Sequence, residues 1–195
     1  MLHGATAPHR CSGRGGTKGP RAKQTMAKYV ALLRAVNVGG TGKLPMPELA
    51  AMCVAAGFTK VKPYIASGNV VFESAAKPAG VKAELEARLL AYAGKPVGVV
   101  VRTAAEMERI LKANPFPKAA PNRTVAIFLD QPPPSDALAY AVGLKDEKLQ
   151  LEQREIYVHY GDGMGTSKLR IPAAKTGTAR NMNTIAKLAE MAARL

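Results

Sequence analysis

The sequence Leu33–Glu73, LRAVNVGGTGKLPMPELAAMCVAAGFTKVKPYIASGNVVFE, contains each kind of element from which the fold is built. This segment begins at the end of an apolar strand, includes a glycine loop that ends at Lys43, and continues through a helical segment into two short strands. Pro47 is typical of the first turn of a helix, and Gly57 is typical of a helix end. This order of elements predicts the first part of a split β-α-β unit.

The flanking sequence completes the unit. An apolar strand is predicted at Tyr29–Val36, and a hairpin joins Val61–Ile65 to Asn69–Glu73. Apolar residues at helical spacing predict a helix over Pro78–Ala93, and Val97–Arg102 follows as a strand. The resulting order is β-α-β-β-α-β, which is the ferredoxin-like order. Because nearly every position of the first strand is apolar, both of its faces are expected to be covered.

A related alternation follows in the second half. Thr103 and Glu106 form a capping box before a helix, and Ser135 is expected to cap a short one. Three strands are predicted, at Thr124–Leu129, Lys148–Glu152 and Glu155–His159. A C-terminal helix starts near Asn181 or Asn183. The predicted fold class is therefore α+β with two ferredoxin-like subdomains, at residues 26–102 and 103–195.

Residues 1–25 are rich in Gly and basic side chains and almost devoid of large apolar ones. Such a segment buries too little surface to offset the entropy lost on ordering, so we expect it to be disordered. It lacks the apolar core of a secretory signal. We expect Met26 to be the natural start of the protein.

The net charge of +14 is unevenly distributed. The tail contains five basic residues and no acid, which leaves +9 on residues 26–195. This excess favours anionic partners such as phosphates or nucleic acid, although a solvated basic surface explains it equally well. No apolar run reaches the roughly 20 residues of a membrane span. Two isolated cysteines predict no disulfide framework, so a cytoplasmic location and no membrane partner are expected.

The glycine loop resembles a phosphate-binding P-loop only superficially. That motif requires Gly where Asn37 stands, and Ser or Thr where Leu44 follows Lys43. The loop therefore does not predict a nucleotide triphosphatase. Arg34 has two readings: it forms an ion pair with an acid on a neighbouring strand, such as Glu73, or it binds an anion beside the loop amides.

A second polar cluster lies in the segments Ser167–Leu169 and Lys175–Thr184, just before the last helix. A helix N-terminus attracts anions, although capping by Asn181 or Asn183 explains the pattern equally well. We expect the two clusters to meet in a cleft between the subdomains. The candidate anion-binding residues are Arg34, Asn37, Gly39, Gly40, Lys43, Ser67, Asn69, Lys168, Thr178, Arg180 and Asn181.

Several motifs occur in the order of a known family: LRAVNVGG, K-x-P-M, GF-x-x-V-x-x-Y-I-x-SGNVVF, SKL and TARN-x-NT-x-x-KL. Together they resemble the uncharacterised bacterial family called domain of unknown function 1697, over residues 26–195. The resemblance implies an α+β fold with two ferredoxin-like subdomains, and no reaction or cofactor comes with it. The site residues named above match its motif positions, as do Tyr64 and Gly68. Met182 departs from the family, which often has Trp there.

Catalytic signals are weak. His159 lies on a predicted strand without a partner in its motif, and Ser67 is better explained by the turn that Gly68 allows. Two functions remain, and neither decides whether the protein is an enzyme. The first is binding of an anionic small molecule or nucleotide. The second is nucleic-acid binding through the basic surface and a sheet face, with Tyr64 and Phe72 as the nearby aromatic residues.

Overall fold

The computed structural model describes residues 25–37 and 43–195. The N-terminal half contains the predicted order of elements. They are β1 (Ala27–Leu33), α1 (Met46–Ala55), β2 (Thr59–Tyr64), β3 (Asn69–Ser74), α2 (Pro78–Ala93) and β4 (Val99–Thr103). The four strands form an antiparallel sheet in the order β2-β3-β1-β4. The predicted hairpin is confirmed, since Tyr64 pairs with Asn69. The residues of the expected disordered tail, other than Thr25, lie outside the described residues.

The C-terminal half forms a second antiparallel sheet on the same plan. Its strands are β5 (Thr124–Phe128), β6 (Lys148–Leu151), β7 (Glu155–His159) and β8 (Thr178–Asn181), in the order β6-β7-β5-β8. In place of crossover α-helices it has two 3₁₀ turns, η1 (Ala137–Tyr140) and η2 (Pro172–Ala174). The α+β fold class with two ferredoxin-like subdomains is thus confirmed.

Two local predictions in this half were wrong. Asp136, not Ser135, occupies the position before η1, and no side chain caps that turn. The polar segment before the last helix, for which no strand was predicted, contains β8, whose residues pair with β5 from Val125 opposite Asn181 to Phe128 opposite Thr178. This strand depends on a partner some 50 residues earlier in the chain, so it has no local signature.

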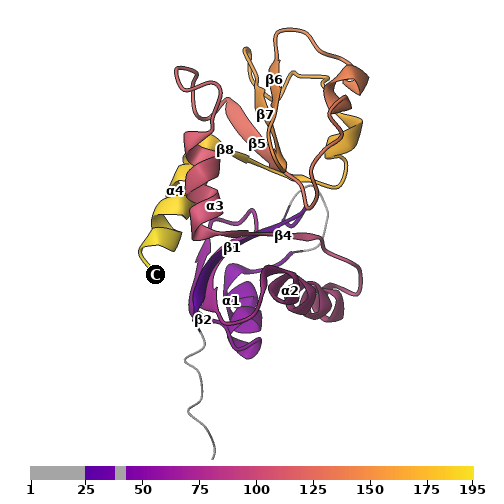
Figure 1. Ribbon diagram of the computed structural model, residues 1–195. Coiled ribbons are helices and arrows are strands. Elements are labelled where there is room, and N and C mark those ends of the chain that lie inside the picture. Colours follow the sequence, from indigo (N-terminus) through magenta and orange to yellow (C-terminus); the bar gives the residue numbers. More distant parts are fainter. Residues whose placement is uncertain (1–24, 38–42) are drawn as a thin grey trace, which may run out of the picture.

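Two helices, α3 (Ala104–Lys112) and α4 (Met182–Ala193), lie between the two sheets (Figure 1). They pack against one face of each sheet in a shared core that includes Leu32, Ile110, Phe128 and Ile185. The predicted capping box is present, because Thr103 Oγ1 accepts from the Glu106 amide and the Glu106 carboxylate accepts from the Thr103 amide. Burial of each large apolar side chain of these helices contributes about 2 kcal/mol to stability, and this burial holds the two halves together.

The outer faces of the two sheets are covered differently. In the N-terminal half, α1 and α2 cover a core that includes Leu49, Phe72 and Leu85. In the C-terminal half the corresponding core, around Ile156 and Val158, is covered by the turns and loops near η1 and η2. Both faces of β1 are therefore buried, as its apolar sequence predicts.

A buried ion pair connects the halves. Arg102 on β4 donates from Nε to Glu155 Oε1 on β7 at 3.0 Å, and both side chains are almost fully buried. Its Nη2 also donates to the Leu129 carbonyl at 2.6 Å. Burial lowers the pKa of Arg102, and the Glu155 carboxylate opposes that shift. None of the helices described here is long and apolar enough to cross a membrane.

Candidate functional site

A pocket lies at the end of the N-terminal sheet where β1 ends and β4 begins. These two ends meet because the strands are antiparallel neighbours, with Leu33 opposite Val99. The Arg34 amide donates to the Gly98 carbonyl at 2.9 Å, which ties the segment after β1 to the one before β4. The cavity has a volume of about 540 Å³. Its lining residues are Arg34, Ala35, Val36, Lys43, Leu44, Leu89, Tyr92, Ala93, Lys95, Pro96, Val97 and Gly98.

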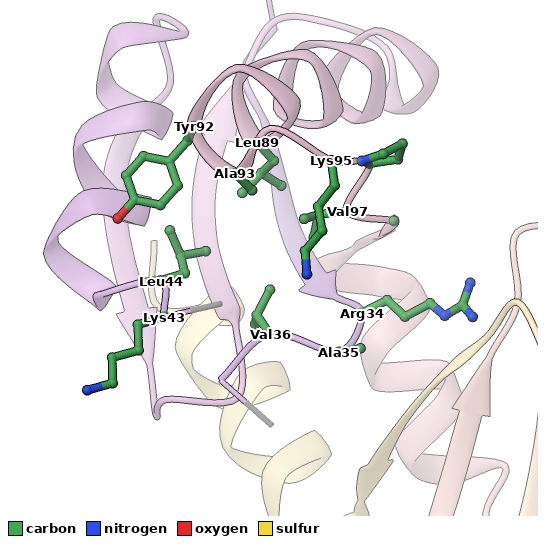
Figure 2. Close-up of a pocket in the computed structure, with 12 residues that line it drawn as sticks. Arg34, Ala35, Val36, Lys43, Leu44, Leu89, Tyr92, Ala93, Lys95 and Val97 are labelled. Atoms are coloured by element: carbon green, nitrogen blue, oxygen red, sulfur yellow. The ribbon is translucent and has the colours of Figure 1, made fainter. Parts of the chain in front are cut away.

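Three of these lining residues are cations and none is an acid. Figure 2 shows the Lys95 ammonium directed toward Ala35 and Val36, whereas the Arg34 and Lys43 side chains extend away from one another. Among the described residues, none of these three cations forms a salt bridge. Positive charge in a lining that contains no carboxylate makes a pocket attractive to anions.

The inner wall of the pocket is apolar. Leu44 and Leu89 are almost fully buried, and Val36 lies beside them. Tyr92, near the end of α2, is 46% exposed, and its ring stands over Leu44 in Figure 2. The pocket therefore combines an apolar wall with cations around it.

The backbone after β1 explains why Arg34 reaches this pocket. Ala35 and Asn37 have positive φ angles of 52° and 56°. The side chains therefore no longer alternate between the two faces of the sheet after Leu33, where the strand ends. Arg34 is consequently exposed, rather than sharing the buried face of Leu32. The expected ion pair with Glu73 is absent, since Glu73 bonds instead to Lys60 at 3.1 Å. Glu73 lies beside the opposite end of β1, roughly 20 Å along the strand.

Asn37 is bonded to the segments that contain Leu44 and Ala66. Its Nδ2 donates to the carbonyls of Leu44 and Ala66, at 2.9 and 2.7 Å, and its Oδ1 accepts from the Leu44 amide at 2.8 Å. These bonds occupy the side-chain amide that the sequence suggested as an anion ligand. Gly39 and Gly40 lie outside the described residues, so their predicted role stays a prediction.

Arg180 on β8 is enclosed at the junction of the two halves. Its Nε donates to Asn69 Oδ1, and its Nη1 donates to Thr178 Oγ1 and the Ala179 carbonyl at 2.8 Å. Its Nη2 donates to the Leu33 carbonyl at 2.9 Å and the Ser67 carbonyl at 2.8 Å. Burial lowers the pKa of Arg180 to about 10, which leaves it cationic at neutral pH. With each nitrogen bonded to a protein acceptor, this guanidinium acts as a connector between the sheets.

The remaining predicted site residues are also placed by the fold. Gly68, with a φ of 76°, forms the turn after Ser67, and a Cβ there would lie 2.3 Å from Val36 Cγ2. Asn181 caps α4 by accepting from the Thr184 amide at 2.9 Å, as one reading of the sequence proposed. Lys168 is exposed and does not line the pocket. Of the candidate residues that the structure describes, only Arg34 and Lys43 line it, and no residue of the C-terminal half contributes.

A family model described as "Protein of unknown function (DUF1697)" matches residues 26–157. The chain belongs to this family. A solved structure of the conserved bacterial protein SP0830 from Streptococcus pneumoniae is similar to it, with a TM-score of 0.70 and 25% sequence identity. That similarity covers 86% of this chain and 99% of the other. No curated protein matches the chain. The DUF1697 description names neither a ligand nor a reaction.

Of the three cations that line the pocket, sequence reasoning missed Lys95. It follows Gly94, which ends α2 with a φ of 66°, and it looks in sequence like an ordinary lysine of a helix end. Only the packing of α2 against β4, whose first residues lie beside the end of β1, brings it to the pocket. A single sequence contains no residue spacing or residue pair that predicts this placement.

The weak catalytic candidates in the DUF1697 chain have structural partners. His159 Nδ1 lies 3.2 Å from Thr124 Oγ1, and its ring is beside Phe116. Ser67 Oγ accepts from Asn69 Nδ2 at 2.9 Å within the turn. In residues 25–37 and 43–195, no three His, Cys, Asp or Glu side chains are grouped to hold a metal ion.

Proposed function

We propose that this chain binds a phosphorylated or otherwise anionic small molecule, such as a nucleotide, in the pocket beside Lys95. The observation that carries this proposal is a cavity lined by three cations and no carboxylate. An anion entering it gains charge-assisted hydrogen bonds from flexible donors that pair with no acid among the described residues. The site differs from the one expected from the sequence, because it belongs to the N-terminal half rather than to a cleft between the halves.

The alternative of nucleic-acid binding through a sheet face has less support. Recognition on such a sheet requires aromatic side chains that stack on exposed bases. Here Phe72 is fully buried and Tyr64 packs against the shared core beneath α3 and α4. The basic surface remains available to nucleic acid, and a salt series distinguishes this alternative.

Titration calorimetry with phosphate monoesters, including nucleoside monophosphates, tests the proposal. Removing one charge with Lys95→Met should weaken binding by about 1.5–3 kcal/mol, the usual contribution of a hydrogen bond to a charged group. Lys168→Met, which removes an exposed cation outside the pocket, is the matched control and should leave affinity unchanged.

Two results contradict the proposal. The first is equal loss of affinity in both variants, which indicates a diffuse electrostatic effect. The second is binding of single-stranded RNA or DNA with a steep salt dependence while no monoester binds, which supports the nucleic-acid alternative.

A further inference from the structure

The pocket has more apolar wall than a simple anion needs. Tyr92, which is 46% exposed, and the exposed lining residues Ala93 and Pro96 offer apolar surface to a ligand, whereas Leu44 and Leu89 behind them are almost fully buried. A volume of about 540 Å³ falls in the range of sites for drug-sized ligands. A free phosphate or sulfate ion fills only a small part of such a space and leaves the apolar wall in contact with water.

The three cations of the pocket are all exposed, but their side chains point in different directions. In Figure 2, the Lys95 ammonium points into the space beside Ala35 and Val36, while the Lys43 ammonium extends outward. Lys95 is placed there by Gly94, whose left-handed backbone ends α2 and turns the chain toward Pro96. A single cation directed into the space suits a ligand whose charge is confined to one end.

We propose that the ligand is an amphiphilic anion, with a phosphate, sulfonate or carboxylate head at Lys95 and an aromatic or short aliphatic body against Tyr92, Ala93 and Pro96. This inference rests on the proposed function and adds the class of ligand. The body releases ordered water from the wall, and the head pairs with the ammonium, so the two parts reinforce one another. Lys43 and Arg34 increase the rate of encounter through their positive field.

Three probes represent the whole ligand and each of its two parts. 1-Naphthyl phosphate has the anionic head and the aromatic body, 1-naphthol has only the body, and inorganic phosphate has only the head. We expect 1-naphthyl phosphate to bind at least tenfold more tightly than either part, by titration calorimetry. Lys95→Met should weaken 1-naphthyl phosphate at least tenfold and leave 1-naphthol unchanged. This difference between probes would not follow from a general loss of structure.

A second pair of variants tests the apolar wall. Ala93 lines the pocket and is exposed on α2, so Ala93→Trp should fill the space and weaken both naphthyl probes at least tenfold. Ala91→Trp places the same ring on the same helix at an exposed position that does not line the pocket, and should bind like the unmodified protein.

The outcomes separate the two proposals. Inorganic phosphate binding as tightly as 1-naphthyl phosphate, with both sensitive to Lys95→Met, overturns the amphiphilic ligand and leaves the anion pocket supported. Equal effects of Ala93→Trp and Ala91→Trp also overturn it. If none of the probes and no phosphate monoester binds, both the ligand class and the proposed function are wrong.

Discussion

The two halves of the chain share one strand order but stabilise it differently. The N-terminal sheet has two α-helices of 10 and 16 residues on its outer face, whereas the C-terminal sheet has two 3₁₀ turns of 4 and 3 residues. Helices bury continuous apolar stripes, and short turns bury isolated side chains. The C-terminal sheet consequently depends more on α3, α4 and the contacts that it makes with the other half.

Two buried arginines show this dependence from opposite sides. Arg102 extends from the N-terminal sheet to a carboxylate, Glu155, in the C-terminal one. Arg180 extends from the C-terminal sheet to neutral acceptors in the N-terminal one, among them the Leu33 carbonyl and Asn69 Oδ1. The first contact is an ion pair between two buried charges. In the second, a buried charge is stabilised by hydrogen bonds to neutral groups of the protein. Their removal should therefore have different consequences.

The largest effect is expected for Glu155→Gln. It leaves the buried Arg102 without its countercharge, and such a change typically destabilises a fold by about 3–5 kcal/mol. The free energy of unfolding from guanidinium titration measures this loss. Glu108→Gln removes an exposed helical pair with Lys112 and should show no measurable change. A loss below about 1 kcal/mol for Glu155→Gln would contradict the coupling of the halves by this pair.

The next effect compares the outer layers directly. Leu85 on α2 is fully buried, so Leu85→Ala should destabilise the protein by about 2–5 kcal/mol. Leu138 in η1 is only partly buried, and Leu138→Ala should lower stability by less than about 2 kcal/mol. Thermal unfolding of both variants gives the comparison. Equal losses would show that the turns of the C-terminal half cover their core as well as helices do.

A smaller loss of stability than for Glu155→Gln is expected for Arg180→Met. It leaves neutral carbonyl acceptors unsatisfied but also removes a buried charge that lacks an acid partner, so a loss of about 1–3 kcal/mol is expected. Arg170→Met, at an exposed arginine, provides the control for denaturant unfolding. Unchanged stability together with at least tenfold weaker binding of a phosphate monoester would return Arg180 to a ligand site.

The family motifs are visible in the sequence, and most helices and strands could be predicted from it because the interactions that form them are local. The helix Pro78–Ala93 and the strand Glu155–His159 were predicted with the bounds that the structure has. The capping box at Thr103 and the cap at Asn181 depend on residues three positions away. Periodicity, caps and turn residues act within a few residues, so a single sequence contains them.

The remaining features were decided by contacts between distant segments. Strand β8 exists because β5 offers it a partner, and Arg180 is buried because Leu33 and Ser67 supply acceptors more than 100 residues earlier. Lys95 reaches the pocket only because α2 packs against β4, whose first residues lie beside the end of β1. The sequence by itself determined most of the elements and the positive charge. Tertiary structure alone decided which cations were enclosed by protein and which were left exposed, because burial depends on what folds over each side chain.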